Sequence, residues 1–226
     1  MPSHFPNIRV ILFDLDGTLV DTIPDLADSL GLAMKAMGMP APAEDTVRLW
    51  VGNGVTRLLK RAVTGEMNGE PDDDALEHAC CLFKDAYAQH LCVRSRVYPD
   101  VIETLAVLQR REFRMGVVTN KPQAFTKPLL NQLDLTGYFG VVLSADSLPV
   151  QKPDPTPVLN AMEKLQGTAC GTLLVGDSST DIQAARAAGM PAVAVSYGYN
   201  HGRDIAEDGP DAVIDAFAEL PGLLEE

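Results

Sequence analysis

Three short polar segments each follow an apolar run, and together they carry the residue types that phosphoryl transfer needs. The segments span residues 14–18, 119–121 and 176–181, and Lys152-Pro153 adds a cation between the last two. Mg²⁺ prefers one or two carboxylates together with water and phosphate oxygens. Carboxylates in two of the segments, with hydroxyls and a lysine beside them, therefore predict a site for magnesium and phosphate.

The first segment offers two carboxyl groups that could play different parts. Asp14 and Asp16 are two residues apart, so in an extended segment they project to the same side. A carboxylate nucleophile divides hydrolysis into phosphorylation and dephosphorylation steps. The second carboxyl can protonate the leaving oxygen and later deprotonate water. A lysine and a hydroxyl such as Lys152 and Thr119 can hold the equatorial phosphate oxygens, where charge spreads in the transition state.

Each segment taken alone also has an ordinary structural explanation. Asp16-Gly17 is a common turn pair, and Thr119 or Ser179 could cap the following helix. Lys152 alone could be a solvated surface charge. Only the combination of the three segments with Lys152 favours a catalytic site.

The elements that must position these residues alternate along most of the chain. Strands are expected at 8–13, 115–119, 141–144, 173–176, 192–195 and 212–214, and helices at 100–111, 123–133, from about 155, and at 180–188. This alternation predicts an α/β fold, a doubly wound parallel sheet with helices on both faces. Ligands of such sheets bind beyond the carboxyl ends of the strands, where the polar segments fall.

One stretch breaks the alternation. From Thr22 to Leu91, apolar residues recur at helical spacing, and prolines and glycines divide the stretch into about four helices. We expect a helical cap domain at 22–98, inserted after the first strand. The α/β catalytic core would then consist of residues 1–21 and 99–226.

The three segments together with Lys152-Pro153, in their order along the chain, resemble the four motifs of the haloacid dehalogenase-like superfamily of phosphatases, whose Rossmann-like core carries an inserted cap. The resemblance implies that Asp14 is the nucleophile and a metal ligand. It implies that Asp16 is the general acid and base and also a metal ligand, through its backbone carbonyl. Dehalogenases of this fold lack an aspartate at position 16, because a departing halide needs no proton, so Asp16 favours phosphate chemistry.

The same resemblance assigns the remaining motif residues. Thr119 and the backbone N–H of Asn120 would hold the transferring phosphoryl group, and Lys152 would lie beside them. Asp177 would be a further Mg²⁺ ligand, with Asp181 supporting it in the metal site. The cofactor implied is therefore Mg²⁺.

A narrower resemblance, to phosphoglycolate phosphatases, rests on residues 50–54, 119–121 and 196–202. It implies that Gly52, Asn53 and Gly54 form a cap loop that reaches the organic end of the substrate. Arg57, just inside the following helix, could pair with a substrate carboxylate. The alternatives, a plain helix–helix turn at 52–54 and a surface arginine, remain open.

The reaction that these resemblances imply is Mg²⁺-dependent hydrolysis of 2-phosphoglycolate to glycolate and phosphate through an aspartyl-phosphate. A phosphatase or phosphomutase of the same superfamily acting on a sugar phosphate or a nucleotide is the alternative. A non-catalytic binding module of the same fold is disfavoured, because both Asp14 and Asp16 are present.

Composition narrows the partners. The net charge is −13 and no basic stripe is present, which argues against nucleic acid. The longest apolar runs are too short to cross a bilayer, and residues 1–9 lack the pattern of a secretory signal. We expect a cytoplasmic protein that acts on a small phosphorylated metabolite and binds neither nucleic acid nor membrane. The oligomeric state and the pathway stay open.

Overall fold

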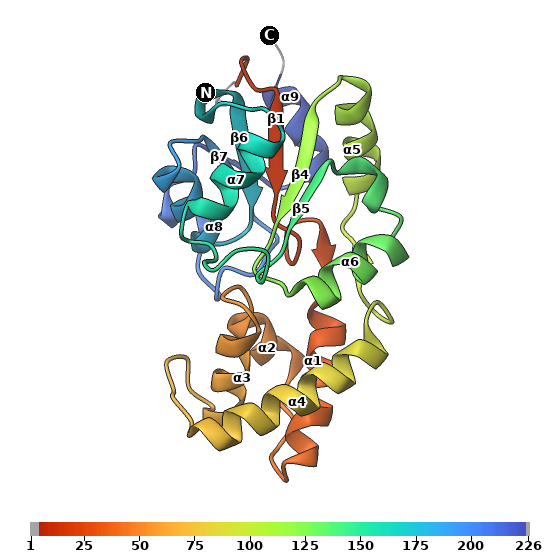
Figure 1. Ribbon diagram of the computed structural model, residues 1–226, viewed down its shortest axis with the longest axis vertical. Coiled ribbons are helices and arrows are strands. Elements are labelled where there is room, and N and C mark those ends of the chain that lie inside the picture. The colour runs from red at the N-terminus through yellow and green to blue at the C-terminus, as the bar shows by residue number, and fades with distance from the viewer. Residues whose placement is uncertain (1–4, 225–226) are drawn as a thin grey trace.

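A six-stranded parallel sheet forms the centre of the α/β part in a computed structural model, which describes residues 5–224 (Figure 1). Its strands, in the order β5-β4-β1-β6-β7-β8 across the sheet, are β5 Val141–Leu143, β4 Arg114–Val118, β1 Val10–Phe13, β6 Thr172–Gly176, β7 Ala192–Val195 and β8 Ala212–Ile214. Every neighbouring pair is parallel. The predicted doubly wound α/β fold is therefore confirmed.

Helices cover both faces of this sheet, because alternate residues of each strand point to opposite sides. On one face, Val10 and Leu12 pack with α7 Thr156–Lys164 and α8 Ser179–Ala187. On the other, Ile11 and Phe13 pack with a second set of helices, which are α5 Val101–Arg110, α6 Gln123–Gln132 and α9 Leu220–Leu223. All four residues of β1 are fully buried. Burial of each apolar side chain contributes about 1.5–3 kcal/mol to the stability of the fold.

Four helices lie consecutively between the first strand and the rest of the sheet, as expected. They are α1 Ile23–Ala36, α2 Glu44–Trp50, α3 Val55–Thr64 and α4 Asp73–His90. The longest, α4, buries Ala79, Phe83 and Tyr87, which recur every four residues and so share one face. The α4 helix begins where the Asp72 side chain accepts a hydrogen bond from the Ala75 N–H, an N-cap that satisfies an otherwise unpaired donor.

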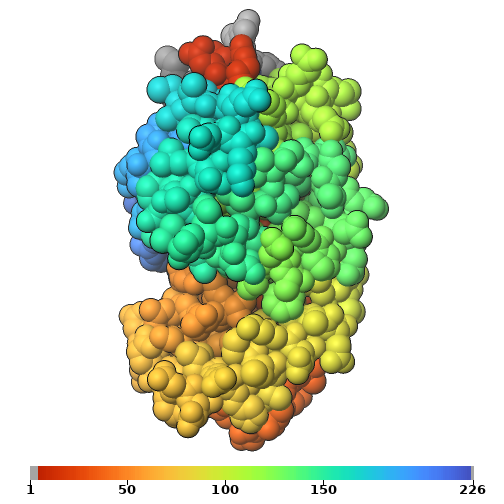
Figure 2. All heavy atoms as spheres, viewed as in Figure 1, coloured from red at the N-terminus to blue at the C-terminus, as the bar shows by residue number. Residues whose placement is uncertain are grey.

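Two very short strands join the helical part to the sheet. β2 Val20–Asp21 pairs antiparallel with β3 Arg96–Val97. The helices lie beyond the carboxyl ends of the sheet strands (Figure 1), and Figure 2 shows the two parts meeting there. We propose that the β2–β3 pair marks the boundary between the core, 1–21 and 99–226, and the cap, 22–98.

The remaining ordered segments are short. Single 3₁₀ turns occur at η1 Thr136–Tyr138, η2 Ala169–Gly171, η3 Ile205–Asp208 and η4 Phe217–Glu219. Within residues 5–224, no helix combines the length and the apolar character that a membrane crossing would require.

Candidate active site

The predicted polar segments meet at one edge of the sheet. β1 lies between β4 and β6, and the parallel register sets Phe13 opposite both Val117 and Val175. Asp14 follows β1, Thr119 follows β4 and Asp177 follows β6. Three segments that are far apart in the sequence thus place their polar side chains together.

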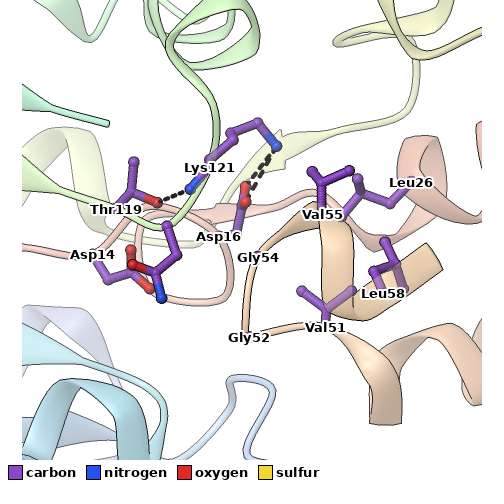
Figure 3. Close-up of a pocket in the computed structure, with 11 residues that line it drawn as sticks. Asp14, Asp16, Leu26, Val51, Gly52, Gly54, Val55, Leu58, Thr119 and Lys121 are labelled. Atoms are coloured by element: carbon purple, nitrogen blue, oxygen red, sulfur yellow. Dashed lines mark hydrogen bonds and ion pairs between the residues drawn. The ribbon is translucent and has the colours of Figure 1, made fainter. Parts of the chain in front are cut away.

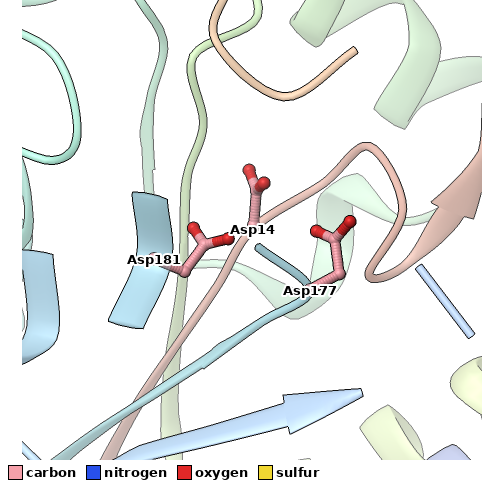
Figure 4. Close-up of side chains that lie close together, drawn as sticks. All are labelled: Asp14, Asp177 and Asp181. Atoms are coloured by element: carbon pink, nitrogen blue, oxygen red, sulfur yellow. The ribbon is translucent and has the colours of Figure 1, made fainter. Parts of the chain in front are cut away.

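Three carboxylates form a tight cluster there. Asp14, Asp177 and Asp181 each offer an oxygen, and these atoms all lie within 4.8 Å of one another (Figure 4). Burial raises the pKa of Asp177 well above its usual range, and the neighbouring Asp181 and Asp14 raise it further. A divalent cation would relieve this repulsion, and hard carboxylate oxygens are the ligands that Mg²⁺ prefers. The donor set therefore fits the implied metal.

The three carboxylates are not equivalent. Both oxygens of Asp181 are already engaged: one lies 2.6 Å from the Lys152 ammonium, and the other accepts hydrogen bonds from the backbone N–H and the hydroxyl of Ser178. Asp181 therefore supports the site through Lys152 and the start of α8. The oxygens of Asp177 accept only from uncharged donors, the Thr18 hydroxyl and the Tyr199 N–H, so its charge is not already met by an ammonium, and Asp177 is better placed than Asp181 to hold the ion beside Asp14.

Lys152 connects the nucleophile candidate to this support. Its side chain is buried, and its ammonium lies 3.1 Å from Asp14. Burial lowers the pKa of Lys152, but its ion pairs with Asp14 and Asp181 outweigh that effect, so the net shift is upward. Burial raises the pKa of Asp14 to about 6, although Lys152 lowers it. The ionised Asp14 thus depends on positive charge beside it.

Asp16 lies apart from the cluster. Its carboxylate accepts a hydrogen bond from the Thr22 hydroxyl at 2.9 Å and contacts the Lys121 ammonium at 3.1 and 3.2 Å (Figure 3). With its carboxylate held by Thr22 and Lys121, Asp16 could contribute to a metal site only through its backbone. Lys121 also donates to the Tyr87 hydroxyl on α4, at 2.7 Å.

The second segment holds its neighbours in place. The Thr119 hydroxyl accepts a hydrogen bond from the Lys121 N–H. The Asn120 side chain pairs with the backbone of Lys152, donating to its carbonyl at 2.9 Å and accepting from its N–H at 3.1 Å. Asn120 therefore fixes the loop that carries Lys152.

A cavity of about 40 Å³ lies where the helical part meets the sheet edge. Its lining consists of Asp14, Asp16, Leu26, Val51, Gly52, Gly54, Val55, Leu58, Thr119, Asn120 and Lys121. The core side is polar and the side formed by the helices is apolar (Figure 3). Gly52 and Gly54 have φ values of 123° and 82°, which glycine adopts at little cost.

The structure brings Gly52 and Gly54 to the cavity, but not Arg57. Arg57 forms an ion pair with Glu70 at 3.0 Å and is partly exposed. It follows Val55 by two residues, which is about 200° around a helix, so the two side chains point in opposite directions. The hydrogen bonds of Asn53 run to Thr180 in the core, at 3.3 Å, and from Arg61, at 2.9 Å.

Comparison with known proteins gives the family. The model of the haloacid dehalogenase-like hydrolases matches residues 11–195. The chain belongs to this family. It is 46% identical over 218 residues to the phosphoglycolate phosphatase of Nitrosococcus oceani, covering 96% of this chain and 97% of that protein. The phosphoglycolate phosphatase of Nitrosospira multiformis is 45% identical over 223 residues, covering 98% of each chain.

A solved structure agrees with these relatives. The crystal structure of a predicted phosphoglycolate phosphatase from Haemophilus somnus 129pt superposes with a TM-score of 0.91 at 37% identity, covering 97% of this chain and 99% of that one. The predicted family, fold and enzyme class are confirmed: these curated relatives are phosphatases, and this chain is a hydrolase of the same family.

In this hydrolase, sequence reasoning left three site residues without a role. Lys121 stands directly after Thr119 and Asn120, and that position was the available signal. Tyr87 has the spacing of a core residue of α4, so its position in the sequence did not indicate a role at the site. Tyr199 lies within residues 196–202, one of the stretches that carry the narrower resemblance, but that resemblance gave it no role. Its N–H donates to Asp177 at 2.7 Å, and its hydroxyl accepts from the N–H of Thr22 and donates to Asp21, next to the β2–β3 junction.

Two glycines allow the loops to approach Asp177 closely. A Cβ atom added at Gly17 would lie 2.3 Å from an oxygen of Asp177, and one added at Gly198 would lie 2.1 Å from its Cβ. Both distances are far below van der Waals contact. The glycines therefore keep the loops against the carboxylate, which also accepts a hydrogen bond from the Thr18 hydroxyl at 2.9 Å.

Proposed function

We propose that this hydrolase is a Mg²⁺-dependent phosphatase that hydrolyses 2-phosphoglycolate to glycolate and phosphate, through a phosphoryl group carried on Asp14. The observation that carries the proposal is the arrangement at the strand ends. The Asp14 carboxylate lies 3.1 Å from the Lys152 ammonium and clusters with Asp177, and Asp14 lines one cavity together with the separately held Asp16. Near-full-length relatives with 45–46% identity that are phosphoglycolate phosphatases support the choice of substrate.

The proposed reaction has two displacements. In the first, an oxygen of Asp14 attacks phosphorus, the bond from phosphorus to the glycolate oxygen breaks, and Asp16 gives its proton to that oxygen. In the second, Asp16 takes a proton from water, whose oxygen attacks phosphorus and releases phosphate from Asp14. Lys152 and Thr119 hold the phosphoryl oxygens in both steps. Mg²⁺ held by Asp14 and Asp177 would offset the repulsion between carboxylate and phosphate.

The organic end of the substrate would lie toward the helical part. The cavity is small, which suits a short substrate. Gly54 precedes the first turn of α3, and no side chain caps that helix. Unpaired N–H groups at a helix N-terminus attract anions. The loop of Gly52, Asn53 and Gly54 is therefore proposed to face the substrate, as the sequence suggested, whereas Arg57 has no part in the proposal.

The test is a phosphate-release assay with 2-phosphoglycolate, ethyl phosphate and glucose 6-phosphate, run with Mg²⁺ and again after removal of metal by EDTA. We expect kcat/KM to be highest for 2-phosphoglycolate by about 100-fold or more, because buried donors left unpaired penalise an analogue without the carboxylate. Activity should vanish in EDTA and return with Mg²⁺. A metal-stripped enzyme that keeps its rate would contradict the proposed metal, and equal efficiency on all three esters would contradict the proposed substrate.

A further inference from the structure

A second buried lysine lies at the site, and the proposed reaction does not use it. Lys121 is 4% exposed, and its ammonium contacts both oxygens of Asp16 and the Tyr87 hydroxyl. In Figure 3 its side chain runs away from Thr119 and Asp14, toward the cap side of the cavity where Val55 and Leu26 lie. The phosphoryl group has its own lysine, Lys152. Lys121 therefore stands outside the phosphoryl-binding set.

We propose that Lys121 binds the carboxylate end of the substrate and, by exchanging partners, releases Asp16 for proton transfer. The inference rests on the proposed function, because it assigns the carboxylate subsite of that reaction. Its ligand class is a short phosphate ester that carries a carboxylate close to the phosphate.

The lining of the cavity supports this assignment. Among the described residues that line it, Lys121 is the single cation, and Asp14 lines the same cavity. A substrate with its phosphorus at Asp14 and only two carbons beyond the phosphate must place its other end close by. Arg57, the other candidate for this carboxylate, is paired with Glu70 outside the cavity.

The ion pair between Lys121 and Asp16 explains why the exchange of partners would favour a substrate that carries a carboxylate. Both oxygens of Asp16 face Lys121, so Asp16 cannot turn to a leaving oxygen while it stays the partner of that ammonium. Leaving a buried charge without a partner is strongly unfavourable. A substrate carboxylate replaces Asp16 as the partner, so the buried ammonium keeps a counter-charge when Asp16 is released. An ester without a carboxylate offers no replacement, and Asp16 remains held.

Tyr87 fixes the ammonium from the cap side. Within residues 5–224, the only hydrogen bond of its hydroxyl is the one that it accepts from Lys121. Burial raises the pKa of Tyr87 to about 12 although Lys121 lowers it, so the hydroxyl keeps its own proton. Tyr87 is thus a positioning residue that ties the carboxylate subsite to α4.

The experiment compares 2-phosphoglycolate with ethyl phosphate, which has the same skeleton without the carboxylate. The quantity measured is kcat/KM for 2-phosphoglycolate divided by kcat/KM for ethyl phosphate. Damage to the site that slows both substrates equally cancels in this ratio. We expect Lys121→Met to lower this ratio by about 10- to 100-fold, the value of a charged hydrogen bond. The matched control Lys60→Met removes a cap lysine that pairs with Glu70, and the ratio should stay at the wild-type value.

Tyr87→Phe provides a second variant that keeps the buried ring, and it should lower the ratio by about 2- to 10-fold. Circular dichroism verifies the fold of each variant. A wild-type ratio near one overturns the proposed substrate. If the wild-type ratio is high and both Lys121→Met and Tyr87→Phe retain it, the proposed role of Lys121 is overturned. The proposed function is unaffected by that result.

Discussion

At the core end of the cavity, charged groups are fixed by short polar contacts: Lys152 lies within 3.1 Å of two carboxylates, and Asn120 fastens its backbone. At the cap end, the lining is formed by apolar side chains and by the glycines of the loop before α3. In the proposed reaction, the first arrangement binds the phosphoryl group, which every phosphate ester shares. The second limits size and shape, so discrimination must come from the few polar groups that reach it, and Lys121 is the charged one.

The largest effect is expected from a substitution at the core end of the cavity. Asp14→Asn keeps the shape of the side chain but removes the nucleophilic carboxylate, so phosphate release should fall by about 10⁴-fold or more. Covalent labelling of the protein by phosphate should disappear as well. The control Asp134→Asn changes an exposed aspartate at a positive φ, which asparagine tolerates. A folded Asp14→Asn enzyme that keeps a tenth of its activity would show that Asp14 is not the nucleophile.

An intermediate effect is expected at Asp16, which lies between the two ends. Asp16→Asn should slow hydrolysis of 2-phosphoglycolate by about 10²–10⁴-fold, the range of general acid–base catalysis. With p-nitrophenyl phosphate, the leaving group needs no proton, so the first step should survive and the second should slow. Rapid-mixing measurements should then show a burst of p-nitrophenol followed by slow turnover. Equal loss of burst and turnover would argue against the acid–base role.

The smallest expected effect concerns the loop that joins the two ends. Asn53→Ala removes the hydrogen bond to Thr180 and a partner of Arg61. Because one such bond contributes about 0.5–1.5 kcal/mol, KM for 2-phosphoglycolate should rise by about 2- to 12-fold. The matched control is Asn131→Ala, an exposed position of α6. If KM for p-nitrophenyl phosphate rises equally, the loop acts on the phosphoryl site and not on the organic end.

The same contrast separates what the sequence could predict from what it could not. The core strands were predictable because Val10–Phe13 and Thr172–Gly176 are continuous apolar runs that end in polar segments. The junction strands β2 and β3 were not predicted, because two residues are too few for a periodic signal. Motif order gave the positions of the candidate carboxylates along the chain, but not the direction of each carboxylate, which separates Asp16 from Asp14 and Asp177.

At the cap, sequence reasoning pointed to the loop of Gly52, Asn53 and Gly54 and to Arg57 as the cation. Arg57 was attractive because it follows the loop closely, but the rotation of α3 turns it to Glu70. The contact between Lys121 and Tyr87 joins residues 34 positions apart. No local pattern reports such a contact, since Tyr87 shares its helix face with the buried Ala79 and Phe83.

Tyr199 has a consequence of a different kind. Its N–H holds Asp177 at the sheet edge, while its hydroxyl holds Asp21 and the N–H of Thr22 at the entry to the cap. Thr22 in turn holds Asp16. A shift of this one residue would alter both the carboxylate that would bind a cation and the strand at the entry to the cap. Any cap movement that displaced Tyr199 would therefore be thermodynamically linked to cation affinity, and the linkage would be reciprocal: the cation would favour whichever cap orientation favours its binding.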